Sequence, residues 1–195
     1  YTSPHTLSLH DALPISSNEN SQVSLCYSNS KAWYSRWKII EDARKSIDVQ
    51  YFIMDEDIFG YSLLGMLLKK AQEGLRVRLL LDARGTKKFT RKLLGQDFLQ
   101  ELTEFPNVEV KVFNPVHTNL LSAITDLRKL IASNHDKIVV VDEEYSIIGG
   151  RNVSMDYFLE PQDHPGAYRD CDVIIKSGEI AKQLDYAFDE EFAKL

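Results

Sequence analysis

Residues 135–152 read HDKIVVVDEEYSIIGGRN, and this stretch predicts a β-hairpin. Two apolar runs rich in β-branched residues, 137–141 and 145–149, have the composition of short strands. The acidic residues between them suit a turn. The stretch therefore predicts two antiparallel strands joined by a tight turn.

One face of the predicted hairpin carries side chains that could perform chemistry. With a turn of two or four residues, Lys137 faces Gly150 and His135 faces Asn152, and alternate residues of a strand share a face. Lysine and asparagine supply hydrogen-bond donors, histidine supplies a nucleophile or proton carrier, and glycine lets a ligand approach the backbone. Such a cluster suits a phosphate or phosphodiester better than a carbonyl group or a metal ion.

The opposite face of the hairpin predicts a structural contact. There Asp136 opposes Arg151, which predicts an ion pair between the two strands. The face with His135 offers too few histidine, cysteine or carboxylate ligands for a metal, so we expect no metal ion there. The family resemblance given below implies that no organic cofactor is required either.

A strand–helix–strand unit precedes the hairpin. Residues 47–54 and 75–82 alternate as strands, and 61–73 between them form a helix that Gly74 can end in a left-handed conformation. Two strands joined by a helix in this way pair in parallel with a right-handed crossover.

The remaining elements complete an α/β prediction. We expect a mixed, largely parallel sheet with helices on both faces, an α/β/α sandwich. The further elements are a helix over about 31–45 capped by Ser30, helical segments over 87–104 and 120–131, strands over 108–113 and 171–176, and a C-terminal helix from 185.

Composition narrows the choice of partners. The formal net charge is −6, which does not favour a long polyanion such as DNA. No apolar run approaches the length of a membrane span. The segment 120–131 could be an amphipathic membrane-binding helix, but a helix packed on the sheet fits its two basic residues better. Two cysteines without a CxxC spacing indicate free thiols.

The first residues do not resemble the rest of the domain. Residues 6–15, TLSLHDALPI, resemble a translated sequencing adapter, so we assign 1–15 to a non-native or disordered tail and 16–195 to the domain. The helix at the C-terminus shows no stop signal. We therefore expect the chain to be truncated at both ends.

The hairpin also carries residues of fixed type at fixed spacing that resemble the signature motif of a known family. HxKxxxxDxxxxxxGGxN fits His135, Lys137, Asp142, the pair 149–150 and Asn152, and it resembles the signature of the phospholipase D superfamily at each fixed position. The segments SIDVQYF (46–52), DIFG (57–60), KAQEG (70–74), VRLLLD (77–82), GGRNVSMDY (149–157) and YRD (168–170) resemble the first half of bacterial cardiolipin-synthase-like members. Those relatives carry two such motifs, whereas this chain carries one.

The resemblance implies a mechanism and roles. Two motif halves form one site, in which one histidine forms a phosphohistidine and the other transfers protons. His135 would be one of the two, as nucleophile or as acid, and Lys137 and Asn152 would hold the phosphate. Asp142, Gly149 and Gly150 would be supporting motif positions. Asp170 would orient the His135 ring, with Asp172 as the competing candidate.

Three functions of different class follow. The first is half of a phospholipid enzyme, a cardiolipin-synthase-like phosphatidyltransferase or phospholipase D, acting at a bacterial membrane surface and completed by a second motif half. The alternatives are a single-motif endonuclease that works as a dimer, and a non-catalytic half module. An intact trio of His135, Lys137 and Asn152 argues against the last.

Overall fold

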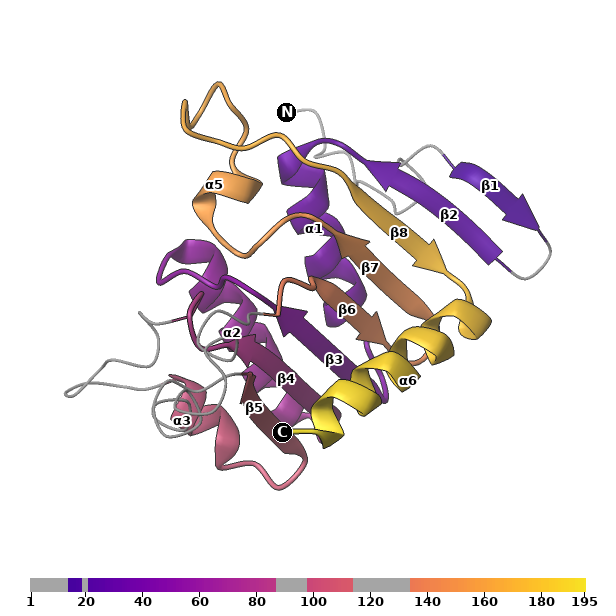
Figure 1. The fold of residues 1–195 in the computed structure, drawn as a ribbon, viewed down its shortest axis with the longest axis vertical. Helices are drawn as coiled ribbons and strands as arrows, with labels where there is room; N and C mark the ends of the chain where they lie inside the picture. The colour runs from indigo at the N-terminus through magenta and orange to yellow at the C-terminus, as the bar shows by residue number, and fades with distance from the viewer. Residues whose placement is uncertain (1–13, 19–20, 87–97, 114–133) are drawn as a thin grey trace, which may run out of the picture.

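This computed structural model describes residues 14–18, 21–86, 98–113 and 134–195. Its strands form one eight-stranded sheet in the order β1-β2-β8-β7-β6-β3-β4-β5 (Figure 1). The strands are β1 (Pro14–Asn18), β2 (Ser21–Cys26), β3 (Ser46–Tyr51), β4 (Arg76–Asp82), β5 (Val108–Phe113), β6 (Ile138–Val141), β7 (Tyr145–Gly149) and β8 (Asp172–Lys176). The helices are α1 (Asn29–Glu41), α2 (Ile58–Gln72), α3 (Phe98–Thr103), α5 (Met155–Phe158) and α6 (Gly178–Ala193).

The α/β class and the mixed sheet are confirmed, but the parallel part is smaller than the sequence predicts. Only β3–β4 and β4–β5 pair in parallel among the described strands, and the other five pairings are antiparallel. The physical reason is the chain path, since parallel neighbours need a crossover and the β6–β7 hairpin returns directly. The predicted strand–helix–strand unit is confirmed as β3, α2 and β4.

Helices cover both faces of the sheet (Figure 1). The main apolar core lies on the face covered by α1 and α2, and alternate residues of β4 such as Val77 and Leu79 point into it. Leu80 points to the other face and packs with Phe188 and Phe192 of α6. Because both faces of the central strands are buried, the site described below can lie only at an end of the sheet.

The start of α1 differs from the prediction, whereas the end of α2 agrees with it. Ser28 caps α1 by accepting a hydrogen bond from the backbone of Lys31, so the prediction that Ser30 is the cap is wrong. Ser30 lies in the first turn and donates to Glu160 instead. Gly74, with φ of 89°, ends α2 as predicted.

Some predictions fall on residues that the structure does not describe. Residues 87–97 of the predicted helix over 87–104 and the whole predicted helix over 120–131 lie outside the described residues, as do residues 1–13. Residues 14 and 15 begin β1, an edge strand that the sequence pattern did not predict. The foreign origin of 1–15 stays a prediction. Cys26 and Cys171 are free thiols, and no helix within the described ranges has the length and hydrophobicity to cross a bilayer.

A buried cluster of charges joins α1, β8 and the segment after β7. Asp172 Oδ2 accepts hydrogen bonds from Arg36 at 2.7 Å and from Arg151 at 3.1 Å, and these side chains are at most 3 % exposed. Burial alone would lower the pKa of Arg36, but Tyr51 and Asp172 outweigh it and raise that pKa above its ordinary value. The guanidinium of Arg36 therefore stays charged inside the protein.

The hairpin turn is tied to the start of β3 by one carboxylate. Asp142 accepts hydrogen bonds from the backbone N–H groups of Arg44, Lys45 and Ser46 at 2.9, 2.7 and 2.9 Å. Its φ of 56° is a left-handed conformation, which aspartate tolerates better than most residues. Asp142 thus fixes the end of the hairpin that lies opposite His135.

The buried cluster generates a stability prediction. Asp172→Ala leaves Arg36 and Arg151 buried without their counter-charge, so we expect the free energy of unfolding to fall by about 3–5 kcal/mol. Urea denaturation followed by circular dichroism measures it. Asp163→Ala, at an exposed position, is the control and should stay within about 0.5 kcal/mol of wild type. Equal losses in the two variants would contradict the assigned role of the cluster.

The hairpin turn generates a second prediction. Asp142→Ala removes the acceptor of three backbone N–H groups, so we expect a loss of about 1–2 kcal/mol, similar to the loss of a helix cap. Glu143→Ala is the matched control, because Glu143 is exposed and has nearly the same φ, 54°. If Glu143→Ala destabilises the protein as much as Asp142→Ala, backbone strain and not hydrogen bonding accounts for the effect.

Candidate active site

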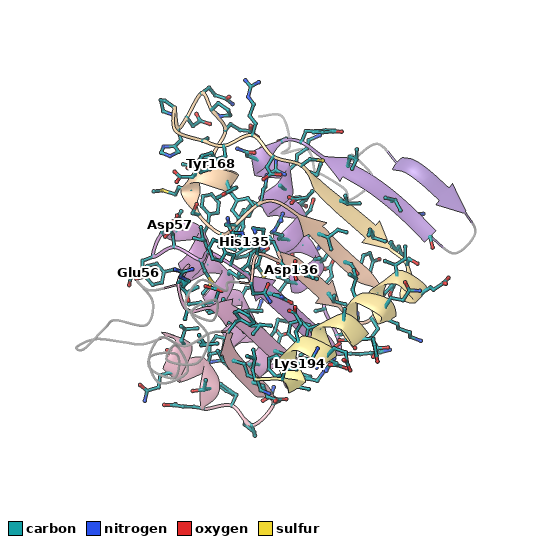
Figure 2. All side chains as sticks on the ribbon, in the orientation of Figure 1. Glu56, Asp57, His135, Asp136, Tyr168 and Lys194 are labelled. Atoms are coloured by element: carbon teal, nitrogen blue, oxygen red, sulfur yellow. The ribbon has the colours of Figure 1, made fainter. Side chains whose placement is uncertain are left out.

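The two ends of the sequence motif meet at one end of the sheet. His135 and Lys137 come just before β6, and Gly150 and Asn152 follow β7. The C-terminal end of β3 lies beside them, because β3 runs antiparallel to β6 and pairs with it. Figure 2 shows His135 on the same side of the molecule as Asp57, which caps α2.

The register of the hairpin differs from the prediction by one residue. Three residues separate β6 from β7, and the first two have positive φ angles of 56° and 54°. Ile138 pairs with Ile148, so the next position outward sets Lys137 against Gly149 and not Gly150. The predicted cross-strand pairs are therefore wrong, and the paired ladder ends before it reaches the motif residues.

His135 stacks on Phe52 instead of lying across from Asn152. The two ring centroids are 4.0 Å apart and the ring planes are inclined by 21°. The Nζ atom of Lys137 lies 5.6 Å from the centroid of the same Phe52 ring, and it donates a hydrogen bond to the backbone carbonyl of His135. Since His135 is exposed, a ligand can reach its ring at the end of β3.

Asn152 is attached to the same end of β3. Its side chain is buried, and its Oδ1 atom accepts a hydrogen bond of 3.0 Å from the backbone N–H of Ile53, the residue after Phe52. Its Nδ2 atom donates to the hydroxyl of Tyr157 at 3.1 Å. The fold thus gathers His135, Lys137 and Asn152 around Phe52 and Ile53, although the hairpin ladder does not pair them.

The two glycines of the motif each lie against a carboxylate. A Cβ atom on Gly150 would stand 2.4 Å from Asp170 Oδ2, and one on Gly149 would stand 2.1 Å from Asp172 Oδ1. Both distances are far below contact, so neither position accepts a larger residue without movement. Asp170 also accepts a hydrogen bond from the backbone of Cys171 at 2.7 Å.

The two candidate acids occupy different surroundings. Partial burial lowers the pKa of Lys137 from its ordinary value of 10.5, while the negative charges of Asp136 and Asp170 oppose the shift. Asp170 is therefore near enough to Lys137 to act on its charge. Asp172 is fully buried in its cluster with two arginines. Asp170 thus borders the motif residue Gly150, whereas Asp172 belongs to the buried cluster.

The predicted ion pair between Asp136 and Arg151 is wrong. Asp136 is exposed, whereas Arg151 is fully buried and bonds to Asp172. Arg151 also donates to the backbone carbonyls of Cys26 and Tyr27 at 3.1 and 2.8 Å. The shifted register explains the difference, because it turns Arg151 toward the core face that α1 covers.

Sequence reasoning missed several residues that shape the site. Arg36 could have been found, because a charged residue on the helical stripe of Ala32 and Ile40 must be buried with a partner. Phe52 could not, since an aromatic residue at the end of a strand is usually core. Tyr157 likewise has no distinguishing signal in the sequence.

The arrangement can bind and transform an anion. An ammonium and an amide supply donors, an exposed imidazole supplies a nucleophile or proton carrier, and Asp170 supplies a carboxylate against Gly150. His164, the other histidine in the described ranges, pairs with Asp156 at 2.7 Å. No group of three or more histidine, cysteine or acidic side chains in those ranges could hold a metal ion.

Comparison with known proteins places the chain in a family. The family model described as cardiolipin synthase, PLD-like domain, matches residues 37–192. Cardiolipin synthase C of Escherichia coli (strain K12) is 38% identical over 130 residues, covering 65% of this chain and 26% of that protein. A cardiolipin synthase of Geobacillus kaustophilus (strain HTA426) is 32% identical over 168 residues, covering 86% of this chain and 31% of that protein.

A solved structure agrees at the level of the fold. Nuc from Salmonella typhimurium, described as a phospholipase D family member, superposes with a TM-score of 0.59 at 16% identity. The match covers 89% of this chain and 95% of that one. At this identity the likeness shows the fold alone.

The chain spans about a third or less of the length of the curated relatives it matches. The family match nevertheless covers most of the chain and contains each residue of the candidate site. On that ground the chain belongs to the family of cardiolipin synthase, PLD-like domains.

Proposed function

We propose that this chain contributes one half of a phospholipase-D-type active site that cleaves or transfers the phosphodiester of phospholipids. One observation carries the proposal, namely the exposed His135 ring held on Phe52 with Lys137 and Asn152 attached to the same end of β3. The relatives named above as cardiolipin synthases support the lipid as substrate.

The proposed reaction proceeds in two displacements. A ring nitrogen of one histidine bonds to phosphorus, and the ester oxygen leaves as an alcohol after taking a proton from a second histidine. That second histidine then removes a proton from water or from an acceptor alcohol, whose oxygen displaces the ring nitrogen. Lys137 and Asn152 stabilise the charge on the phosphoryl oxygens. His135 is one of the two histidines, and either role fits its exposure.

Asp170 is the proposed partner of the His135 ring. A carboxylate that accepts from one ring nitrogen fixes the tautomer and leaves the other nitrogen free for phosphorus or for a proton. Asp170 lies against Gly150 and acts on the charge of Lys137, which supports its place in the site.

The second histidine must come from a second motif half. The relatives are much longer than this chain, so a further part of a longer protein would supply it, or else a second copy of the chain would. A dimeric nuclease uses the same chemistry, but the net charge of −6 disfavours DNA as substrate.

A bacterial membrane surface is the proposed working place, because the proposed substrate is a phospholipid and the named relatives are bacterial. Ile58, Met155 and Tyr168 are 66%, 40% and 55% exposed. The backbone N–H of Met155 bonds to Asp57 at 2.6 Å, which brings the starts of α2 and α5 together. Figure 2 shows Asp57, Tyr168 and His135 on one side of the molecule. Exposed apolar side chains near the site suit contact with lipid.

The proposed phosphate-binding role of Lys137 and Asn152 can be tested with sulfate as a probe. Sulfate is used because it keeps one charge state across the pH range of the experiment. We expect NMR titration to show sulfate binding that shifts the His135 ring signals. Lys137→Ala should weaken it by about tenfold or more, as loss of a charged hydrogen bond does. Asn152→Asp should weaken it likewise, because it keeps the acceptor for Ile53 but loses the donor. Lys182→Ala, at an exposed position on α6, is the control.

The pH dependence of sulfate binding follows from Lys137. Its pKa is lowered from 10.5, so it loses its charge at a lower pH than an exposed lysine does, and binding should weaken as the pH rises toward 10.5. Lys137→Arg keeps its charge throughout and should remove that dependence. Unchanged pH dependence in Lys137→Arg would contradict the role of this ammonium.

The shared site generates a prediction on lipid turnover. Phosphatidylglycerol vesicles incubated with dilute, monomeric chain should show almost no cleavage or transfer, because one histidine of the pair is missing. When self-association or the second half completes the site, His135→Asn should lower the rate by at least about 100-fold, and His164→Asn should not. High turnover by the monomer would contradict the shared site, and cleavage of DNA without turnover of lipid would bring the nuclease alternative forward.

A further inference from the structure

Asn134 holds the backbone on both sides of His135. Its backbone N–H donates to Asp82 Oδ2 at 2.8 Å, and its side-chain Oδ1 accepts from the backbone N–H of Asp136 at 2.9 Å. Its Nδ2 atom donates to Glu191 Oε2 at 2.7 Å. Asn134 is buried while His135 and Asp136 are exposed, so these bonds anchor an otherwise exposed segment.

Glu191 connects this anchor to the strand that carries Phe52. The same Oε2 atom that accepts from Asn134 also accepts from Gln50 Nε2 at 2.7 Å. Gln50 is buried in β3, two residues before Phe52. The Oε2 atom of Glu191 therefore links Asn134, the residue before His135, to Gln50, two residues before Phe52. His135 and Phe52 are the two partners of the aromatic stack.

The last turns of α6 are themselves fixed to the sheet. Arg78 of β4 bonds to Asp48 at 2.6 Å, to Asp185 at 2.7 Å and to Asp189. Its guanidinium also lies 4.8 Å from the centroid of the Phe188 ring. In Figure 1, α6 crosses the face of the sheet formed by β6, β3 and β4. Glu191 is thus held in place by contacts that do not involve the candidate site.

A second contact holds the end of α6 from β5. The Nζ atom of Lys111 donates to the backbone carbonyl of Phe192 at 2.7 Å, and it lies 4.4 Å from the centroid of the Phe192 ring. A cation at the C-terminal end of a helix is also favoured by the helix dipole. Phe192 is the neighbour of Glu191, so this bond fixes the position of the carboxylate along the helix.

We propose that Asn134 and Glu191 are positioning residues for His135, and that α6 is thereby part of the architecture of the active site. Neither residue touches the substrate. They hold the His135 backbone in the position from which the ring stacks on Phe52 and can contact a phosphate. This inference rests on the proposed catalytic role of His135. Positioning matters there because displacement of a reacting group by about 1 Å can cost about 100-fold in rate.

The test uses the His135 ring as its own reporter. The stacked Phe52 ring shifts the NMR signals of the His135 ring protons upfield, and Phe52→Leu, which lacks the ring, gives the unstacked reference. Glu191→Ala and Asn134→Ala are expected to move these signals toward that reference. Sulfate affinity should fall about tenfold in both, as is typical when a supporting residue is removed.

A matched control lies one residue away. Glu190 pairs only loosely with Lys194, at 3.8 Å on the exposed side of α6, so Glu190→Ala should leave the His135 signals and the sulfate affinity at wild-type values. Glu191→Gln keeps one side-chain oxygen and should give a smaller change than Glu191→Ala. The wild-type dispersion of backbone amide signals identifies variants that remain folded, and Glu191→Gln serves where Glu191→Ala does not fold.

The results separate the two claims. The positioning role is overturned if the Glu191 and Asn134 variants leave the His135 ring signals where Glu190→Ala leaves them, and the proposed function stands if wild type still binds sulfate. If the ring signals respond but wild type binds no sulfate at Lys137 and His135, the proposed function fails while the positioning contact is confirmed.

Discussion

A single buried carboxylate, shared by two buried arginines, organises the part of the molecule that carries the site. Removing a charge from water costs several kcal/mol unless it is paired, so Asp172, Arg36 and Arg151 are stable in the core only together. They come from β8, α1 and the segment after β7, and their pairing fixes the distance between those elements. The second oxygen of Asp172 has no hydrogen-bond partner among the described residues and lies against Gly149. This contact explains physically why the motif needs glycine at that position.

The buried cluster of Asp172, Arg36 and Arg151 positions the candidate site, because the residues of the site are neighbours of this cluster. Arg151 lies between Gly150 and Asn152, so burying its side chain in the core sets the course of the backbone that bears both. Asn152 then reaches the end of β3 through the backbone of Ile53. On the other strand of the hairpin, Asp142 fixes the far end by three backbone hydrogen bonds. The functional groups are thus presented at the end of the sheet by structural contacts on both sides of the hairpin.

The sequence predicts the fold class, and the structure places His135, Lys137 and Asn152 near the same end of β3. Their roles stay a prediction, and their contacts could not be predicted from the sequence. The strand over 108–113 and the role of Gly74 are confirmed, because apolar alternation and a glycine after a helix are strong local signals. The hairpin register was wrong by one residue, since it depends on the left-handed backbone of the turn and not on the strand pattern. The predicted ion pair of Asp136 and Arg151 was wrong for the same reason, because it depended on that register. The contacts of Glu191 join residues far apart in sequence and could not be predicted from local pattern.

The central claim is that His135, Lys137 and Asn152 together form one phosphate-binding half-site. Anomalous X-ray diffraction from crystals soaked in tungstate, a heavy analogue of phosphate, tests it most directly. The account predicts a tungsten peak beside the His135 ring, with tungstate oxygens within hydrogen-bonding distance of Lys137 Nζ and Asn152 Nδ2. A peak elsewhere on the protein, with this end of β3 empty at saturating tungstate, would contradict it.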